Sequence, residues 1–465
     1  MDQNHFLLFD QQQKPIRLQA ERVAFYRQGK FIEVISENNE LYYLFFYKNQ
    51  FLTAAKAKRI RRRSYIAHAF KQGQVFDAPH PFINTLLSEN HPCKIVSFKP
   101  LLKMLEKHYT PQEKAFILTF FESFIPKKTL FHEIKSIFYV YRRNGQGFLG
   151  YRIIRILMGF APNHSLVKEL SGDSMFQNYA NLYKEKSEDL FEKDPIFAEK
   201  ILYARKDSDQ SFNQLKELLE KDSRWIDLIA LYCYKLTQTP AEDYYISLIS
   251  ILEQHVTDDD KVSILEKLDS RLSSFPPLKQ DLFNIYVNSH KIENVSHMMR
   301  QNKLTLSKAQ VSTLGNVLEQ LDTDAGWLNP DSLTALLSPI IDEYPEKAKA
   351  LLYKFVTSLL KTHEPAYVNQ WLEPFKKSPE AQQLIRKIDT MDKLSDDLDQ
   401  MQTLGELFYE FGQLDKAIDC FSWEMELKPT QPKPLQWLSK IYREMGKKHE
   451  SEAYQQLCIN LQKHA

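Results

Sequence analysis

A cluster of basic residues near the amino terminus is the strongest chemical signal in this sequence. Closely spaced ammonium and guanidinium groups attract phosphates, and the aromatic residues that follow, Tyr65 and Phe70, can stack on bases. The pattern predicts a polyanion-binding site, with nucleic acid as one candidate ligand. A solvated basic edge, or an anchor for acidic surface elsewhere in the chain, explains the same residues without a ligand. The cationic residues of this cluster are Lys56, Lys58, Arg59, Arg61, Arg62 and Arg63.

The charge of the chain is divided between its two ends. The 465 residues carry a formal net charge of +1. Residues 1–160 contain 25 Lys and Arg against 12 Asp and Glu, a net of +13, which leaves 36 basic against 48 acidic residues, a net of −12, for the rest. Glycine contributes only 12 residues, which favours long helices over turn-rich sheet. Two regions of different chemistry are expected.

A repeated pattern near the carboxyl end predicts paired helices. Apolar residues four positions apart share one face of a helix, and a following glycine allows the helix to end in the left-handed region. After the first copy, Ala417 and Phe421 predict a second helix that faces back, and Pro429 ends it. A period of 34 residues separates the two copies and is typical of helix-turn-helix repeats. The repeating residues are Leu404, Phe408 and Gly412, then Leu438, Tyr442 and Gly446.

On these residues, segment 398–465 resembles two tetratricopeptide repeats, whose paired helices stack into a superhelix and bind protein segments. In the second copy Ser451 and Gln455 replace the alanine and the phenylalanine. We therefore expect a shifted register in which Ala453, Tyr454 and Leu457 supply the buried face. The polar residues of the last helix predict a cap for the stack. They are Gln455, Gln456, Asn460, Gln462 and Lys463.

The resemblance implies a concave groove lined by the first helix of each repeat. The carboxylate clamp found in part of that family needs lysine and asparagine where this chain has Gln402 and Glu406, so a clamp is not expected. We call the set of groove residues that one helix contributes a rung, so that the first copy gives an acidic rung and the second a basic one. An acidic rung beside a basic one predicts recognition of a peptide that carries both charges, unless the two rungs neutralise each other. The predicted groove residues are Gln402, Glu406 and Tyr409, then Lys433, Gln436, Lys440 and Arg443.

Motifs for catalysis, metal binding and cofactor binding are absent from the sequence. The 13 histidines are dispersed, with no H-E-x-x-H, and there is no P-loop, G-x-S-x-G or G-x-G-x-x-G. The match of Ser165 to Lys168 to S-x-x-K lacks its partner motifs. We predict a protein that is not an enzyme, with no catalytic residues, no metal and no cofactor.

The expected secondary structure places a small mixed domain before a long helical region. Residues 22–52 are rich in β-branched and aromatic residues between turn signals, which predicts a β-meander. Thr110 to Glu113 forms a predicted capping box that opens a helix through about Phe124, and further helices are expected over 130–143 and 149–159. From about residue 163 every segment has helical periodicity.

These elements predict a mainly α fold: a helical, tetratricopeptide-like solenoid (an α-α superhelix) with a smaller basic α+β domain at the amino end. Three regions are expected. They are a basic, aromatic-rich α+β domain over 1–160, a degenerate helical-hairpin solenoid over 161–397, and two repeats with a capping helix over 398–465.

A second, short resemblance concerns the basic cluster. Arg61 to Ile66 is similar to the arginine-serine-tyrosine strand of LytTR-type DNA-binding domains, although the histidine that precedes the arginine there is absent and the spacing from the preceding strand is short. It implies a strand over Arg61 to Ile66.

The cysteines and the apolar runs indicate the cellular environment. Cys93, Cys233, Cys420 and Cys458 form no C-x-x-C pair, which predicts reduced, mostly buried thiols. The first residues lack the features of a signal peptide, and the apolar runs are far shorter than the roughly 20 residues of a membrane span. A cytoplasmic protein with no integral membrane segment is expected.

Together these features predict an adaptor or scaffold that binds a protein partner through the solenoid groove and docks a polyanion on its basic domain. The alternative is a nucleic-acid-binding regulator whose repeats sense a partner or mediate self-association. In a third arrangement the oppositely charged halves contact each other, which gives an autoinhibited form or a homo-oligomer.

Overall fold

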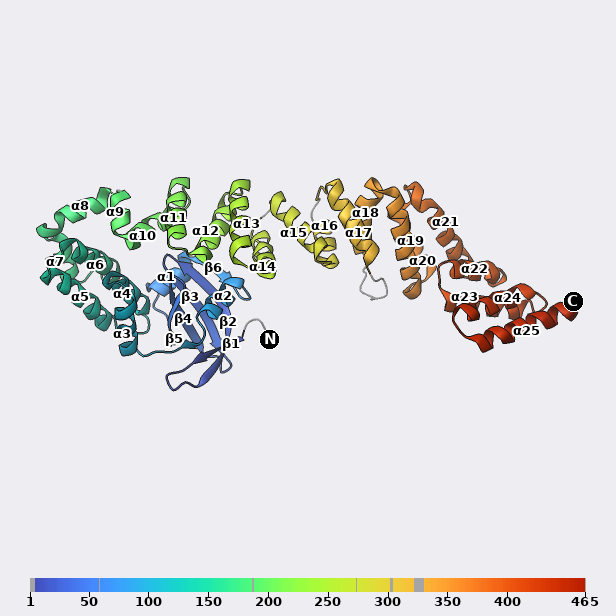
Figure 1. The fold of residues 1–465 in the computed structure, drawn as a ribbon, viewed down its shortest axis with the longest axis horizontal. Helices are drawn as coiled ribbons and strands as arrows, with labels where there is room; N and C mark the ends of the chain where they lie inside the picture. The colour runs from blue at the N-terminus through green and yellow to red at the C-terminus, as the bar shows by residue number, and fades with distance from the viewer. Residues whose placement is uncertain are drawn as a thin grey trace. The chain divides into compact units, whose positions relative to one another are not determined.

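The computed structural model describes residues 5–57, 59–185, 188–272, 274–301, 304–321 and 330–464 (Figure 1). The chain divides by packing into two compact units, Met1–Leu278 and Lys279–Ala465. The fold is mainly α with a β-rich region at the amino end, which confirms the predicted fold class.

Unit 1 is built around a sheet in which β2 is the longest strand. The strands are β1 (His5–Phe9), β2 (Pro15–Tyr26), β3 (Gly29–Ser36), β4 (Leu41–Tyr47), β5 (Gln50–Lys56), β6 (Gln74–Asp77) and β7 (Cys93–Lys94). Their order is β5-β4-β3-β2-β1-β7, and β6 also pairs with β2. A register shift between Ala20 and Arg22 separates the half of β2 that pairs with β1 from the half that pairs with β6. The predicted meander is therefore the centre of a larger sheet.

The helices of unit 1 begin after β5. They are α1 (Tyr65–Gln72), α2 (Pro81–Glu89), α3 (Phe98–His108), α4 (Pro111–Leu118), α5 (Lys127–Arg143), α6 (Gly147–Phe160), α7 (Ser165–Gly172), α8 (Gln177–Glu185), α9 (Glu188–Lys193), α10 (Pro195–Ala204), α11 (Asp209–Lys221), α12 (Trp225–Gln238), α13 (Glu242–His255) and α14 (Asp258–Asp269). The capping box at the start of α4 is present, because Thr110 and Glu113 each accept a hydrogen bond from the other's backbone N–H. The helix continues as a 3-10 turn and ends earlier than predicted, at Phe121.

Both faces of the central part of the sheet are covered, which explains why β4 is apolar on both sides. On one face the ring of Phe45 lies 4.6 Å from that of Phe121, between centroids. On the opposite face Phe25 lies 5.4 Å from Phe82 of α2. Strands buried on both faces have near-continuous apolar sequences rather than alternating ones, and every residue of β4 after Leu41 is buried.

The segment after the basic cluster is helical, so the strand implied by the second resemblance is wrong. The side chain of Ser64 accepts a hydrogen bond from the backbone N–H of Ala67 (3.3 Å) and thereby caps α1, which begins at Tyr65. A serine that satisfies a free N–H at this position stabilises the start of a helix. The arginines therefore lie in a connection between a strand and a helix.

A buried charge network joins the sheet to the helices that follow residue 160. Lys30 of β3 donates to Asp227 of α12 (Nζ–Oδ2 2.6 Å), and Arg224 pairs with both Asp227 (3.2 Å) and Glu199 of α10 (2.6 Å). Arg224 also donates to the carbonyl of Arg27 in the β2–β3 turn (3.0 Å). These groups neutralise one another away from water and join segments on both sides of residue 160, and both segments belong to unit 1, which extends to Leu278.

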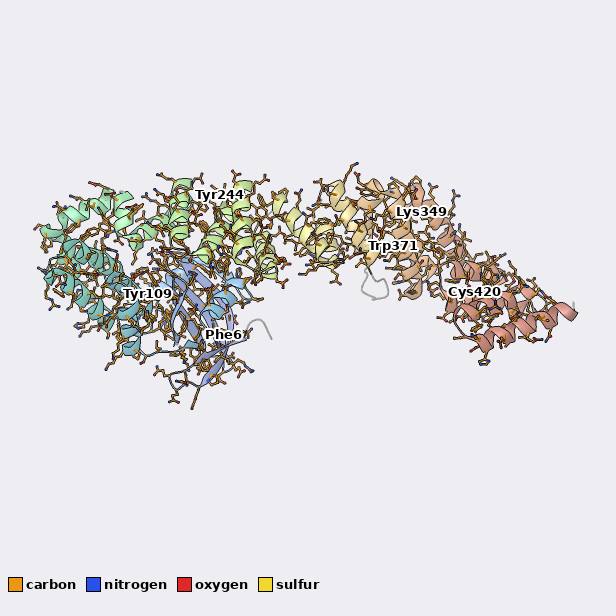
Figure 2. The ribbon with its side chains drawn as sticks, viewed as in Figure 1. Phe6, Tyr109, Tyr244, Lys349, Trp371 and Cys420 are labelled. Carbon is orange, nitrogen blue, oxygen red and sulfur yellow. The ribbon has the colours of Figure 1, made fainter. Side chains whose placement is uncertain are left out.

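The described part of unit 2 is helical. Its helices are α15 (Pro276–Asn288, which begins just before the unit boundary), α16 (Ile292–Gln301), α17 (Lys308–Gln320), α18 (Pro330–Glu343), α19 (Pro345–Thr362), α20 (Pro365–Leu372), α21 (Pro379–Leu394), α22 (Met401–Glu410), α23 (Leu414–Leu427), α24 (Pro432–Glu444) and α25 (Lys448–His464). From α17 onward each helix packs on the next in the chain, and α16 packs on α18. Consecutive packing of this kind is the arrangement of a solenoid. Trp371 of α20 and Cys420 of α23, both labelled in Figure 2, are buried within it.

The first predicted repeat forms the helix pair α22–α23. Leu404, Phe408, Ala417 and Phe421 are all buried, as the repeat pattern requires. Gly412 ends the first helix with φ +68°, a conformation that costs other residues energy. The prediction of paired helices is confirmed for this copy.

The second repeat, α24–α25, keeps the original register. Ser451 is buried at the alanine position, where its hydroxyl donates to the carbonyl of Ser439 (2.7 Å) and the Ser439 hydroxyl donates to the Ser451 carbonyl (2.9 Å). Tyr454 stacks on Tyr442, but Ala453 and Leu457 are exposed, so the expected shift of register is wrong. A serine fits there because both hydroxyl groups find partners.

Candidate functional site

All seven predicted groove residues lie on α22 and α24. We call this surface the α22/α24 face; it consists of Gln402, Glu406, Tyr409, Lys433, Gln436, Lys440 and Arg443, together with Trp437. The two helices are bridged by direct contacts, since Lys433 pairs with Glu406 (2.8 Å) and Tyr409 donates to Glu444 (2.6 Å). The residues therefore form one continuous surface.

The acidic rung of the α22/α24 face is neutralised within the protein. Glu406 accepts hydrogen bonds from Gln402 (2.6 Å) and from the indole of Trp437 (3.2 Å), in addition to its ion pair with Lys433. Burial opposes ionisation of Glu406, but the hydrogen bonds from Lys433 and Gln402 outweigh it and lower its pKa. This carboxylate is thus occupied by internal partners.

Lys440 and Arg443 of the basic rung keep their charge free, and Lys440 lies beside aromatic rings. The ammonium of Lys440 is 4.5 Å from the ring centre of Tyr409 and 4.6 Å from that of Trp437. Lys440 and Arg443 are exposed and, among the residues that the structure describes, have no carboxylate partner. The unpaired charge of this surface is therefore positive.

Trp437 is the residue of this surface that sequence reasoning missed. Its ring stacks on Phe421 with an interplanar angle of 3° and lies 5.0 Å from the ring of Tyr409. The signal was available: Trp437 follows Lys433 by four positions and precedes Lys440 by three, so it shares their helix face. Partly buried tryptophans are frequent energetic centres of protein interfaces.

The basic cluster lies at the end of β5 and in the connection to α1. Lys56 pairs with Glu40, and Lys58 lies outside the described residues. Arg59, Arg61, Arg62 and Arg63 are exposed and have no carboxylate partner within the described ranges. Because the backbone N–H of Arg61 donates to Ser123 (3.1 Å), the connection is fixed against the helical part of unit 1.

The thiols are free and buried, as the sequence predicts. Burial raises the pKa of Cys93 and Cys420 to about 11, so these thiols are protonated and unreactive at neutral pH. Within the described ranges, His, Cys, Asp and Glu nowhere gather in a group that could hold a metal ion. The helices there are too short or too polar to cross a membrane.

Comparisons with known proteins give structural similarity without a family. No protein-family model and no curated protein matches the sequence. Sixty solved chains match by structure. MamA AMB-1 is 19% identical over 40% of this chain and 94% of its own (TM-score 0.16). The Naa15/Naa10 complex bound to HypK-THB is 11% identical over 78% and 60% (0.21), and a human IFIT1 dimer with PPP-AAAA is 12% identical over 76% and 94% (0.20). TM-scores this low assign neither fold nor function. The evidence for helical repeats is the consecutive packing of the helices in unit 2.

Proposed function

We propose that this chain is a non-enzymatic, cytoplasmic adaptor that binds a segment of a partner protein on the α22/α24 face. The observation that carries the proposal is the free positive charge of Lys440, which lies beside Tyr409 and Trp437, together with that of the exposed Arg443 on the same helix. Exposed cations next to aromatic rings bind acidic segments that also carry apolar anchors. Since Glu406 is already occupied, the partner segment is acidic rather than of mixed charge.

A pull-down with the intact chain tests this proposal. The variant Lys440→Glu plus Arg443→Glu reverses the charge of the face without removing a buried group. The matched control is Lys377→Glu plus Arg386→Glu, which changes one exposed lysine and one exposed arginine elsewhere in unit 2. Captured proteins are identified by mass spectrometry. We expect partners with acidic segments to be lost from the first variant and retained by the control; retention by both contradicts the proposal.

The basic cluster supports a second activity, the docking of a polyanion on Arg59, Arg61, Arg62 and Arg63. If that polyanion is nucleic acid, the chain is a regulator whose repeats bind a partner or mediate self-association. Binding of a labelled oligonucleotide by the intact chain is measured at several salt concentrations. A nucleic-acid-binding protein loses affinity steeply as salt rises. The variant with Arg61, Arg62 and Arg63 changed to Ser should lose binding, and absence of binding by the wild type at low salt rejects the regulator.

A third proposal is that the opposite net charges of residues 1–160 and 161–465 drive self-association or an autoinhibited form. Charge attraction between copies weakens as salt screens it. Light scattering at low and high salt therefore tests it, and a mass that stays monomeric at both concentrations contradicts a charge-driven oligomer.

A further inference from the structure

A cavity in unit 1 lies between the sheet and the helices that cover it, apart from the α22/α24 face. Its volume is about 380 Å³. Five cationic side chains converge on it from four parts of the unit: Arg27 from the β2–β3 turn, Arg63 from the start of α1, Arg152 and Arg155 from α6, and Lys200 from α10. Small-molecule sites in proteins begin at about 300 Å³.

The two carboxylates of the cavity wall are already occupied by other groups. Asp194 accepts from Gln112 (2.7 Å), from the Tyr183 hydroxyl (2.6 Å) and from the backbone of Phe197 (3.1 Å). Glu122 accepts from the backbone N–H of Tyr65 (3.0 Å) and pairs with Lys127 (3.3 Å). Glu122 is therefore paired with Lys127, and Asp194 offsets at most one of the five cations, Arg152, to which it approaches within 3.9 Å.

The cations, in contrast, lack close carboxylate partners. In the part of the chain that the structure describes, Arg27, Arg63, Arg155 and Lys200 have no carboxylate within ion-pair distance, and Arg152 approaches Asp194 only to 3.9 Å. The Nε atoms of Arg27 and Arg152 are buried without a hydrogen bond. Burying a polar atom without a partner costs free energy.

Repulsion within the cluster is visible at Lys200. Burial, followed by the positive charges of Arg27 and Arg155, lowers the pKa of its ammonium group. A bound anion would offset this repulsion, because opposite charge at close range favours the protonated amine.

The remaining wall is apolar and aromatic, with Phe116, Phe160 and Phe197 among the residues that form it. Arginine forks match the oxygens of phosphate groups, and several of them in one cavity require more than one negative charge. The apolar part of the wall favours a ligand with an organic part. We propose that this cavity binds a small phosphate ester, such as a nucleoside diphosphate, with its phosphates on the arginines and Lys200 and its organic part against the phenylalanines.

Isothermal titration calorimetry on the intact chain tests the proposal with four probes: inorganic pyrophosphate, ADP, GDP and adenosine. We expect both nucleoside diphosphates to bind more tightly than pyrophosphate, and adenosine not to bind. No binding of any phosphate probe overturns the proposal. Equal affinity for pyrophosphate and the nucleoside diphosphates overturns the assignment of an organic part.

Two variants place the binding in the cavity. Lys200→Gln should weaken ADP and GDP binding about ten- to hundredfold, as expected for loss of a charged hydrogen bond. Its matched control, Lys193→Gln, removes an exposed lysine outside the cavity and should change nothing. Gly159→Phe fills the cavity from an exposed position of α6 where an added Cβ meets no atom within 4 Å, so the fold should survive while binding is lost. Unchanged binding in both Lys200→Gln and Gly159→Phe overturns the proposal.

A third variant separates this site from the polyanion surface, with which it shares Arg63. Arg61→Ser plus Arg62→Ser removes two exposed charges that do not line the cavity. Oligonucleotide binding should fall in this variant and nucleoside diphosphate binding should not. Parallel loss of both would show that the phosphate probes bind to the exposed cluster and would overturn the cavity assignment.

Discussion

The sheet–helix junction of unit 1 and the α22–α25 repeats of unit 2 are held together in different ways. In the junction, Lys30 and Asp227 are 197 positions apart in the sequence and meet in a buried ion pair. In the repeats, the contacts join residues within a few tens of positions, and the buried side chains are mostly apolar, among them Leu404, Phe408 and Phe421. The first arrangement depends on distant segments of unit 1 being folded together, and the second mainly on neighbouring helices.

This difference predicts how the stability of each region responds to substitutions. Burial of charge is tolerated only while every partner is present, so loss of one partner leaves an uncompensated charge. At Asp227, burial opposes ionisation, but Arg224 and Lys30 outweigh it and lower the pKa of the carboxyl group, whereas burial lowers the pKa of Lys30 to about 8. Both groups are thus charged at neutral pH. Loss of one apolar contact in the repeats leaves no unpaired charge, so we expect it to lower the free energy of unfolding by less.

The largest effect is expected when the junction loses Asp227. Asp227→Ala leaves Lys30 and Arg224 buried with one carboxylate fewer, which should lower the free energy of unfolding of unit 1 by about 3–5 kcal/mol. Hydrogen exchange resolved by peptide reports unit 1 separately from unit 2. The control is Asp222→Ala, which removes a partner of Lys48 at 2.9 Å in a pair about one third exposed. That change should cost less than about 1 kcal/mol, and equal effects of the two variants would contradict the special role of the buried network.

A second test uses acid, again at a long-range contact of unit 1. Burial, with Lys267 and Arg271 nearby, lowers the pKa of His80 to about 3. In the unfolded chain the pKa of His80 is near 6.5, so as the pH falls the unfolded state binds the proton before the folded state does. The stability that neutral His80 gives to the folded state is therefore complete above pH 6.5 and is lost as the pH falls toward 3. By pH 4 the loss should reach roughly 3 kcal/mol.

The variant His80→Asn isolates this contribution. Asparagine can still accept the hydrogen bond that His80 Nδ1 receives from the backbone N–H of Phe82. Hydrogen exchange of unit 1 between pH 7 and pH 4 should show a shallower loss of stability in the variant. Identical pH slopes in the two proteins would contradict the burial of a neutral imidazole.

A third test concerns the close approach of α22 and α23. A Cβ at Gly405 would lie 2.9 Å from ring atoms of Phe421 and 3.1 Å from Cβ of Cys420. Gly405→Ala should therefore overpack the helix pair and cost about 1–3 kcal/mol in the exchange of α22 and α23. Gly172→Ala, at the end of α7 with no atom within 4 Å, is the control and should be neutral or stabilising. A neutral Gly405→Ala would mean that the helices can separate freely.

The smallest expected effect is at the ends of the first helices of the two repeats. Gly412 and Gly446 have φ values of +68° and +77°, and an added Cβ at either position would meet no atom within 4 Å. Alanine at either should cost about 1–2 kcal/mol through backbone conformation alone. Asparagine tolerates this region better, so Gly412→Asn should cost less than Gly412→Ala in the same exchange measurement; the reverse order would point to a steric cause.

The extent to which sequence predicted structure follows from the range of the interactions. Thr110 and Glu113 are three positions apart, and their capping box was predicted and is present. The register of the second repeat was predicted wrongly, because the Ser451 hydroxyl can be buried only by pairing with Ser439 on another helix. Sequence placed the α22/α24 face on its two helices but left open whether its charges are free, since that depends on contacts between them.

By itself, the sequence determined the helix pairs at the carboxyl end, the glycines that end their first helices, the meander and the exposed basic cluster. Each of these depends on residues close together in the chain, where backbone geometry fixes the outcome. Only the tertiary structure decided that the sheet and the helices up to α14 form one unit, and that five cations meet in one cavity. Those outcomes depend on groups from distant segments that are brought out of water together, where the partners, rather than the residue types, decide the free energy.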